Sequence, residues 1–443
     1  MIRRLFIANR GEIALRIART AQRLGMTTIV GASQADVSSL PAQFADEVAL
    51  IGPAPSAQSY LNVEAVIAAA VAARADAIHP GYGFLSENAR FAEATIEAGM
   101  IFVGPDVTSL NAMGDKLMAR SVGLAAGLPV VPGGEAATPE QAMARARETG
   151  FPVLLKAVAG GGGKGMKRVD RADDMPAMIA MAMSEAQAAF GDPRIYVERF
   201  VARGRHVEVQ VLGDGHDALH LGTRDCSIQR RFQKLVEEAP APQLADATRN
   251  GLEQAAVALT RHLAYRGAGT VEFLVDAQTG DFFFLEMNAR IQVEHPVTEA
   301  ITGVDLIEQQ LLVAAGSRLG LTQDAIRPSG HAIEVRINAE DPAADFRPSP
   351  GRVTRARWPA GPGIRIDSHI ATGGVIPPTY DSLMGKLIVW ARDRPAAVAL
   401  LASALATLSI EGVPTTAPLH RRIAADPRFV AGGVDTRFLE GLA

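Results

Sequence analysis

A segment of alternating polar and apolar residues runs from Glu286 to Glu294. Its even-numbered positions carry Glu, Asn, Arg, Gln and Glu, and its odd-numbered positions are apolar. Because alternate side chains of an extended chain share one face, the pattern predicts a strand with these polar groups along one wall. Glu286 and Asn288 offer the hard oxygen atoms that Mg²⁺ on nucleotide phosphates needs, and Glu272 could supply a third ligand from an adjacent strand. The alternative is an ordinary half-exposed strand, although such strands are usually richer in Lys and Thr.

The second half of this segment carries groups suited to a small anion. Arg290 and Gln292 together would form a planar anion site. Glu294 is a candidate general base beside that site. The residue types therefore predict a metal-bound phosphate group next to an anion and a base.

Glycines at positions 160–163 form a run between two short predicted strands, over residues 153–158 and 166–169. Without Cβ atoms, their backbone amides can approach phosphate oxygens closely. A dinucleotide-binding fingerprint would need a helix after the glycines, and a Walker A loop would need Ser or Thr where Gly165 stands. The pattern instead predicts a hairpin lid over phosphates, with a flexible surface hairpin as the alternative.

Two lysines precede the glycine run. Lys156 lies on the strand that leads into it, and Lys116 lies forty residues further upstream. A single lysine carries little information, because most lysines are solvated. Two lysines beside a glycine lid favour a phosphate clamp.

A basic segment spans residues 224–234, and we interpret it as a loop. As a loop it could be a solvated turn, a nucleic-acid patch or a site for a small anion. It holds one aromatic residue, Phe232, and shows no interleaved stacking pattern, and Glu237 and Glu238 follow soon after it. These features favour an anionic small molecule over RNA or DNA.

Two further polar residues have ordinary interpretations when each is taken alone. His206 is typical of a histidine in a core or an interface. Arg336 is typical of a structural ion pair. Neither predicts chemistry without a wider pattern.

The elements that would position these groups follow from hydrophobic periodicity. Strands and amphipathic helices alternate in the first hundred residues, with strands over 5–8, 27–30 and 76–78 and helices over 13–24 and 63–73. This alternation predicts a parallel sheet covered by helices. Ligands would bind at the carboxyl ends of its strands, where residues 79–83 form a tight loop.

The rest of the chain divides at a second boundary. A helical linker precedes residues 129–134, and a compact segment over 135–203 contains a helix at 139–149. The remainder, from 204 onward, begins with strand patterns and ends with helices. The expected strands cover 207–211 and 282–288, and the expected helices 305–315 and 395–408.

Composition limits the class of protein. The 443 residues suggest about three domains, and 48% hydrophobic against 21% charged residues excludes wholesale disorder. A net charge of −4 argues against a surface built for nucleic acid. The single cysteine, Cys226, excludes an internal disulfide framework and a cysteine-based zinc site. The apolar run at the start of the chain is too short for a secretory signal. The apolar residues 397–410 are too few to span a membrane. We therefore expect a soluble, cytoplasmic protein.

Several of these segments together resemble biotin carboxylase, the ATP-grasp component of biotin-dependent carboxylases. The resemblance follows the family's order along essentially the whole chain, over residues 7–14, 79–88, 113–116, 160–163, 224–240, 286–299, 336–342 and 380–386. It implies an α/β fold with a doubly wound pre-ATP-grasp domain, an ATP-grasp lid domain and a larger α+β carboxyl-terminal domain. The implied limits are 1–112 for the first domain, 113–134 for a linker carrying Lys116, 135–203 for the lid and 204–443 for the catalytic domain.

The resemblance also implies a reaction in two halves. ATP would phosphorylate bicarbonate to carboxyphosphate, and the carboxyl group would pass to N1 of biotin on a carrier protein. The residues implied to bind ATP are Lys116, Lys156, Gly162, Gly163, Glu198, Arg199, Phe200, Val201, His206 and Gln229. Those implied to hold Mg²⁺, or Mn²⁺, are Glu272, Glu286 and Asn288.

On the bicarbonate and biotin side, the resemblance assigns roles to a second set of residues. Those implied to bind bicarbonate are Lys234, Arg290, Gln292 and the backbone of Val293. Glu294 would deprotonate bicarbonate. Arg336 would stabilise the biotin enolate, with Tyr82 and Asp381 nearby.

The sequence departs from the family at three positions. Phe232 stands where a histidine that contacts the nucleotide is common, and Ala159 stands where many members have a further glycine. Arg23 replaces an acidic residue that takes part in the homodimer contact of some bacterial members. The implied partners are a biotin carboxyl carrier protein or domain, a carboxyltransferase component and a second copy of the chain, without nucleic acid or membrane.

Two other functions stay open from the sequence. One is an ATP-grasp ligase that joins a carboxylate to an amine, which would not need Arg290, Gln292, Glu294 and Arg336 together. The other is a catalytically weak ATP-binding homologue, suggested by Phe232. The sequence has no biotinylation motif and no carboxyltransferase region, so we expect either a separate subunit or the first part of a longer one. Nothing in it indicates the final carboxyl acceptor.

Overall fold

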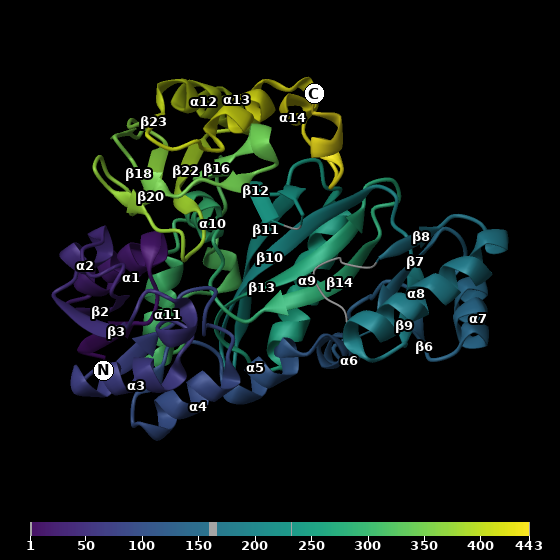
Figure 1. The fold of residues 1–443 in the computed structure, drawn as a ribbon, viewed down its shortest axis with the longest axis horizontal. Coiled ribbons are helices and arrows are strands. Elements are labelled where there is room, and N and C mark those ends of the chain that lie inside the picture. Colours follow the sequence, from purple (N-terminus) through teal and green to yellow (C-terminus); the bar gives the residue numbers. More distant parts are fainter. Residues whose placement is uncertain (1, 159–165, 232, 443) are drawn as a thin grey trace.

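A parallel five-stranded sheet forms the amino-terminal part of the chain. The structure is a computed structural model that describes residues 2–158, 166–231 and 233–442. Its strands lie in the order β3 (Glu47–Gly52), β2 (Thr27–Ser33), β1 (Arg4–Ile7), β4 (Ala77–His79) and β5 (Ile101–Phe102). The connecting helices are α1 (Gly11–Arg23), α2 (Leu40–Phe44), α3 (Val63–Ala72) and α4 (Ala89–Glu97) (Figure 1). The carboxyl ends of β1 and β4 lead into residues 9–11 and 79–83, as the strand and helix alternation predicted.

Alternating residues of β1 bury themselves on opposite faces of this sheet. Leu5 belongs to the core cluster that contains Ile13 and Ile17 of α1. Phe6 belongs to the cluster that contains Val66 of α3 and Phe91 of α4. Helices therefore cover both faces, which confirms the doubly wound arrangement.

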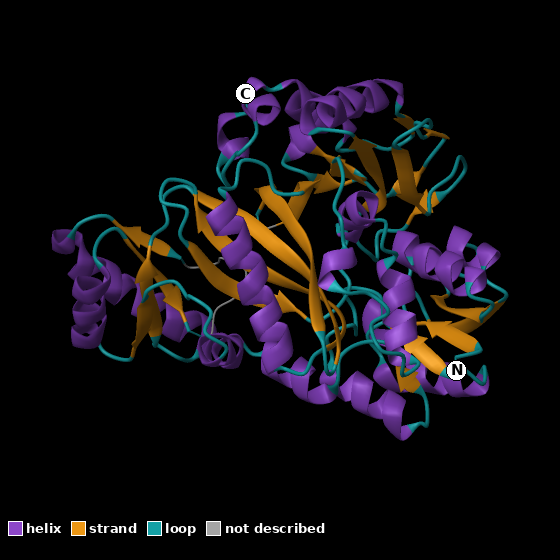
Figure 2. Cartoon of the chain, turned by 180° about the vertical axis from the view of Figure 1, so that it is seen from behind, coloured by secondary structure: helices purple, strands orange, loops and turns teal. Residues whose placement is uncertain are grey.

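A four-stranded antiparallel sheet forms a lobe that projects from the rest of the molecule (Figures 1 and 2). Helices α5 (Val107–Gly114) and α6 (Lys116–Ala125) lead to it. Its strands lie in the order β6 (Gly133–Ala136), β9 (Ile195–Arg199), β7 (Val153–Ala157) and β8 (Lys167–Val169). Helices α7 (Pro139–Thr149) and α8 (Met175–Phe190) pack on it and share with it a separate hydrophobic core. We call this part the lid lobe.

An eight-stranded antiparallel sheet is the centre of the remaining chain. Its order is β14 (Phe282–Asn288), β13 (Arg266–Asp276), β10 (Gly204–Asp214), β11 (Ala218–Arg230), β12 (Gln233–Ala239), β15 (His331–Asn338), β22 (Leu383–Ala391) and β20 (Ile364–Ser368). The helices of this part are α9 (Asp246–His262), α10 (His295–Thr302), α11 (Leu306–Ala314), α12 (Arg394–Thr407), α13 (Ala417–Ala425) and α14 (Pro427–Ala431). Mixed α and β structure in this part agrees with the predicted fold class.

Short elements complete the fold. Three two-stranded pairs are β16 (Glu340–Asp341) with β17 (Arg347–Pro348), β18 (Gly351–Arg352) with β21 (Val375–Ile376), and β19 (Arg355–Arg357) with β23 (Ser409–Glu411). Single 3₁₀ turns are η1 (Ser56–Gln58), η2 (Ala172–Asp174), η3 (Gln323–Ala325), η4 (Pro342–Ala344) and η5 (Phe438–Gly441). Among the described residues, no helix is both long and apolar enough to cross a lipid bilayer. The domain limits at 112, 134 and 203 stay a proposal, and each large sheet lies within one of these segments apart from the first two residues of β6.

The prediction of a continuous strand from 286 to 294 is wrong. Strand β14 ends at Asn288, and the chain then turns irregularly until Glu294, the amino-terminal cap of α10. Pro296 lies in the first turn of this helix, where its missing N–H costs no hydrogen bond. The polar residues after 288 therefore do not share a strand face, and their positions follow from hydrogen bonds within a loop.

The interpretation of residues 224–234 as a loop is also wrong. Residues up to Arg230 belong to β11, and β12 begins at Gln233, so the segment is a hairpin within the eight-stranded sheet. Arg224 is fully buried because β11 lies between β10 and β12. Its charge is compensated within the protein and is not available to a nucleic acid.

Candidate active site

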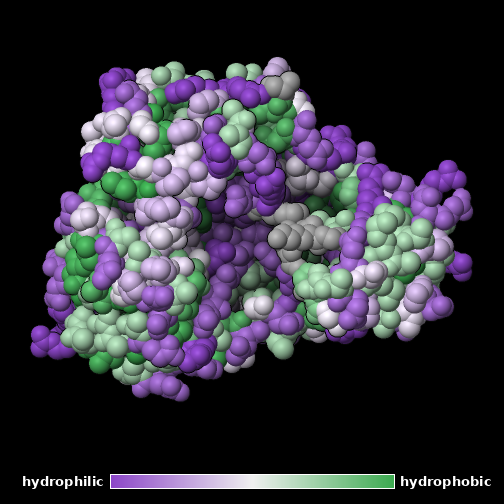
Figure 3. Space-filling view, viewed as in Figure 1, coloured by the Kyte–Doolittle hydropathy of each residue, from purple (hydrophilic) through white to green (hydrophobic). Residues whose placement is uncertain are grey.

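A cavity of about 1880 Å³ lies between the lid lobe and the two larger parts of the chain. Figure 3 shows it as a hollow lined largely by hydrophilic residues. All described residues that the sequence assigned to ATP, metal, bicarbonate and biotin line this cavity, except Glu294, which is fully buried behind the wall. Gly162, Gly163, Ala159 and Phe232 lie outside the described residues.

The lid lobe and α6 supply the lysines. Lys116 is the first residue of α6, and Lys156 lies on β7. Lys156 forms an ion pair with Glu198 of β9, and the chain from Glu198 to Val201 continues along the cavity wall. The Lys156 side chain is 35% exposed, so an entering phosphate could compete for it in water.

The ammonium group of Lys234, on β12, is the centre of the buried part of the site. It donates to Glu208 at 2.6 Å, to Glu272 at 2.8 Å and to Glu294 at 2.7 Å. Burial lowers the pKa of Lys234, but the three carboxylates outweigh it and raise the pKa well above its usual range. Lys234 therefore stays charged and fixes three carboxylates from three chain segments.

The three predicted metal ligands meet at the edge formed by β13 and β14. Glu272 and Glu286 lie opposite each other in the strand register. Asn288 donates through Nδ2 to Glu272 at 2.8 Å. Burial and the nearby Glu272 raise the pKa of Glu286. Glu286 has no hydrogen bond or ion pair with any other described residue, and two facing carboxylates with one left unpartnered fit a divalent cation.

The anion pair of the sequence analysis is present, although it does not lie on a strand. Arg290 donates to the Gln292 side chain at 3.0 Å and to the Asn288 amide oxygen at 2.7 Å. Gln292 donates to Glu272 at 3.1 Å. Glu87, from the loop after β4, accepts from Arg290 at 2.8 Å. The planar guanidinium is thus held from both sides beside the cavity.

Glu294 receives a different cation on each carboxylate oxygen. Lys234 donates to Oε1, and Arg336 of β15 donates to Oε2 at 2.9 Å. Burial raises the pKa of Glu294, but Lys234, Arg336 and Arg224 together lower it well below its usual range. Arg336 also donates to Glu237 at 2.7 Å. Glu294 is therefore ionised in the described state.

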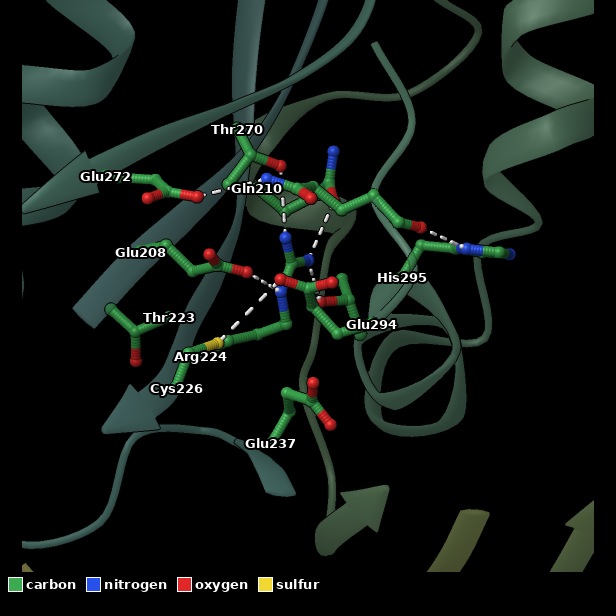
Figure 4. Close-up of polar contacts among 12 residues, drawn as sticks. Glu208, Gln210, Thr223, Arg224, Cys226, Glu237, Thr270, Glu272, Glu294 and His295 are labelled. Atoms are coloured by element: carbon green, nitrogen blue, oxygen red, sulfur yellow. Dashed lines mark hydrogen bonds and ion pairs between the residues drawn. The ribbon is translucent and has the colours of Figure 1, made fainter. Parts of the chain in front are cut away.

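Figure 4 shows the buried framework around Arg224 and Glu294. Arg224 donates to Glu208 at 2.5 Å and also to Gln210, Thr270 and Thr298 at 2.7 to 3.0 Å. The thiol of Cys226 lies 3.9 Å from Oε1 of Glu294. Burial raises the pKa of this thiol well above its usual range, so Cys226 is a neutral packing residue.

His206 and Tyr82 also line the cavity. His206 Nε2 is 2.7 Å from Glu272, and this carboxylate raises the pKa of His206 although burial lowers it. Tyr82 donates its hydroxyl hydrogen to Glu12 of α1. Asp381 lies 3.8 Å from Arg10 at the same edge of the cavity as Tyr82.

The sequence analysis missed several polar residues that hold this site together. They are Glu12, Glu87, Glu208, Glu237 and Lys386. The signal for Glu208 was present, because Val207, Val209 and Val211 alternate with Glu208 and Gln210. A charged residue at an alternating position of a buried strand predicts a paired charge.

Three family models match the chain in order. Residues 1–110 match the biotin carboxylase N-terminal domain. Residues 115–322 match the ATP-binding domain of the carbamoyl-phosphate synthase L chain. Residues 334–441 match the biotin carboxylase C-terminal domain.

Relatives and solved structures are similar to the chain over nearly its whole length. A protein named biotin carboxylase from Nostoc sp. is 51% identical over 440 residues, which cover 99% of this chain and 98% of that protein. A crystal structure of a biotin carboxylase complex with β-γ-ATP from Campylobacter jejuni superposes with a TM-score of 0.92 at 47% identity, covering 99% of both chains. The biotin carboxylase domain dimer of Hydrogenobacter thermophilus 2-oxoglutarate carboxylase, solved with MgADP, ADP and bicarbonate, gives 0.90 at 44% identity, covering 99% and 97%.

Proposed function

Because the chain belongs to the biotin carboxylase family, we propose that it phosphorylates bicarbonate with ATP and passes the carboxyl group to N1 of biotin on a carrier protein. It is an ATP-dependent ligase. The observation that carries the proposal is that Lys234 and Arg336 hold the two oxygens of Glu294. Glu294 thereby connects the groups proposed for bicarbonate with the group proposed for biotin.

The first half-reaction takes a proton from bicarbonate. The residues proposed to bind bicarbonate, which are Lys234, Arg290, Gln292 and the backbone of Val293, all line the cavity, and Glu294 is the proposed base. Glu294 accepts the proton, and the resulting oxygen attacks the γ-phosphorus of ATP, so that ADP leaves and carboxyphosphate forms. Lys234 shares its charge with the bound anion, which weakens its hold on Glu294 and raises the proton affinity of that carboxylate.

The negative charge of the ATP phosphates must be compensated, and the lysines and the metal site both contribute to this. Lys116 and Lys156 neutralise phosphate oxygens, while His206, Gln229 and the stretch 198–201 contact the rest of ATP. When bound by Glu272, Glu286 and Asn288, Mg²⁺ or Mn²⁺ supplies further positive charge to the phosphates. Exclusion of water from the cavity would protect carboxyphosphate from hydrolysis.

The second half-reaction places charge near Arg336. Biotin passes the proton on N1 to an oxygen of the phosphate group that leaves carboxyphosphate, and the oxygen of its ureido group becomes negative. Arg336 faces this oxygen and stabilises the charge, and N1 then attacks the carboxyl carbon while phosphate leaves. Tyr82 and Asp381 line the same cavity and are proposed to lie near the bound biotin.

The partners follow from the same reaction. A biotin carboxyl carrier protein or domain brings biotin, and a carboxyltransferase component consumes carboxybiotin. A second copy of the chain has less support as a partner. Arg23, which replaces an acidic residue of the homodimer contact, pairs at 2.8 Å with both Asp305 and Glu308 of its own chain. The cytoplasmic location stays a prediction of the sequence.

The test measures ADP release by the purified chain with Mg²⁺ and ATP. We expect release to require bicarbonate and to rise on addition of free biotin. A ligase of another class would release ADP without bicarbonate once its own carboxylate and amine are present, and a weak ATP-binding homologue would release none under any of these conditions. Either result would overturn the proposal.

A further inference from the structure

Three segments that are far apart in the sequence meet at the ammonium group of Lys386. Lys386 lies on β22, is fully buried and does not line the cavity. Its Nζ donates to the carbonyl oxygen of Val293 at 2.7 Å, and it lies 3.0 Å from Oε1 of Glu12 on α1. A cation buried so completely is costly unless its partners compensate it, so this arrangement has a fixed geometry.

The Val293 contact holds the loop that carries the anion site. Val293 lies between Gln292 and Glu294, the proposed bicarbonate ligand and the proposed base. The bond from Lys386 fixes the peptide group that joins Val293 to Glu294, at the start of α10. The position of the anion site at Gln292 and Val293 therefore depends on Lys386.

The Glu12 contact holds Tyr82, which also lines the cavity. The same oxygen of Glu12 that pairs with Lys386 accepts the hydroxyl hydrogen of Tyr82. The backbone of Tyr82 is held separately by Asn9, whose Nδ2 donates to the carbonyl oxygens of Pro80 at 2.7 Å and Tyr82 at 2.8 Å. The Tyr82 ring thus has one anchor at its backbone and one at its hydroxyl, and the second anchor depends on Lys386.

The neighbouring strand places the other cation of the site beside Lys386. Lys386 lies opposite Arg336 in the register of β15 and β22, so the two side chains share a face of the sheet. Arg336 bonds Glu294 and Glu237, whereas Lys386 bonds Val293 and Glu12. The two cations divide the task, one contacting the reacting groups and the other fixing the protein groups around them.

We propose that Lys386 is a positioning residue that sets the bicarbonate loop at Val293 and the biotin-side Tyr82 relative to each other. The inference depends on the proposed function, because that function assigns the Val293 loop to bicarbonate and Tyr82 to biotin. It does not involve ATP, whose proposed ligands lie on other strands and on the lid lobe.

The test is a comparison of KM values for Lys386→Met and Glu12→Gln. Lys386→Met removes the donor at similar length, and we expect it to raise the KM for both bicarbonate and biotin by about fivefold or more, with the KM for ATP within about twofold of wild type. Glu12→Gln is expected to raise only the KM for biotin. A loss of kcat with unchanged KM values, or an equal rise in all three KM values, would show a merely structural role and overturn the proposal.

A Tyr82→Phe background isolates the biotin branch. In this background Lys386→Met should no longer raise the KM for biotin but should still raise that for bicarbonate, because the hydroxyl anchor is already gone. The same rise for biotin in both backgrounds would contradict the proposal. If Lys386→Met does not fold, as judged by its thermal midpoint, Glu12→Gln and Tyr82→Phe decide the matter. Their effects on the KM for biotin should then not add, and additive effects would overturn the inference.

The wild-type chain separates this test from that of the function. If wild type shows no bicarbonate-dependent, biotin-stimulated ADP release, the proposed function fails. If wild type shows it and the variants behave otherwise than stated, only the role of Lys386 fails.

Discussion

The centre around Lys234 and the lid lobe treat their charged groups in opposite ways. Lys234 is 11% exposed and bonds three carboxylates, two of which, Glu208 and Glu294, are not exposed at all. Lys156 is 35% exposed and has one ion pair, with Glu198. The centre is built on the eight-stranded sheet and the loop that follows β14, whereas the lid lobe has its own core. The groups proposed for proton transfer are thus buried, and the groups proposed to neutralise phosphate lie where a nucleotide can reach them.

This difference predicts which kinetic constant each region controls. Changes in the centre should lower kcat, because they alter the reacting groups. Changes in the lid lobe should raise the KM for ATP, because they weaken a contact made before the reaction. The following changes test this division.

The largest effect is expected for Glu294→Gln. The amide cannot accept the proton of bicarbonate, so bicarbonate-dependent ADP release should fall by about 10²- to 10⁴-fold. The KM for ATP should stay within about twofold of wild type. Glu253→Gln, on α9 outside the cavity, is the matched control and should keep full activity. Activity of Glu294→Gln within tenfold of wild type would exclude Glu294 as the base.

Arg336→Ala should separate the two half-reactions. The lost charge faces the biotin enolate, so carboxylation of biotin should fall by about 100-fold while bicarbonate-dependent ATP hydrolysis is partly retained. The ratio of the two activities is the readout, because it does not change with the fraction of folded protein. Equal loss of both would give Arg336 a structural or ATP-binding role.

Glu286→Gln should damage the metal site and leave the strand in place. Loss of one charged oxygen ligand should lower ATP cleavage about 10- to 100-fold at ordinary Mg²⁺, with partial recovery at higher Mg²⁺. Rates are measured across a Mg²⁺ titration. Turnover within a factor of two of wild type at ordinary Mg²⁺ would show that the metal assignment is wrong.

Lys156→Gln tests the lid lobe. The KM for ATP should rise about tenfold with little change in kcat, because a charged hydrogen bond to phosphate is lost. Lys167→Gln is the matched control, since Lys167 of the adjacent β8 pairs with Glu185 and does not line the cavity. A fall in kcat at saturating ATP would remove the distinction between the two regions.

The smallest effect is expected in the pH dependence of stability, and it concerns only the centre around Lys234. Burial raises the pKa of Glu237 from 4.5 to about 7, although the charge of Arg336 lowers it. Between these values the native state binds more protons than the unfolded state at this group, so its contribution to stability is lost as pH rises. Urea unfolding at pH 5 and pH 7 should therefore show a steeper decline for wild type than for Glu237→Gln. Equal declines would mean that Glu237 is already ionised at pH 5.

The sequence allowed the chemistry to be predicted better than the local shape. Glu272, Glu286, Asn288 and Arg290 gather as their types indicated, but the strand expected through 294 ends at Asn288. Polar alternation did not distinguish a strand face from a loop whose polar side chains bond to one another. The proline of the following helix was the signal that the alternation had ended.

Apart from Glu208, the residues that support the site could not be found from local patterns. Glu12 and Lys386 are 374 positions apart, and their contact depends on how α1 packs against β22. Likewise, Arg224 looks like a solvated residue in the sequence, and only the position of β11 inside the sheet buries it. Strand order and packing between distant elements decide these contacts, and neither is encoded in a short segment.

The most direct test of the central claim follows oxygen from bicarbonate into phosphate. In the proposed reaction an oxygen of bicarbonate attacks the γ-phosphorus, and the bond between carbon and that oxygen breaks when the carboxyl group leaves. Turnover with ¹⁸O-labelled bicarbonate, ATP and biotin should give inorganic phosphate in which each molecule carries one oxygen from bicarbonate. Phosphate without the label, released at the same rate, would show direct hydrolysis of ATP by water and contradict the account.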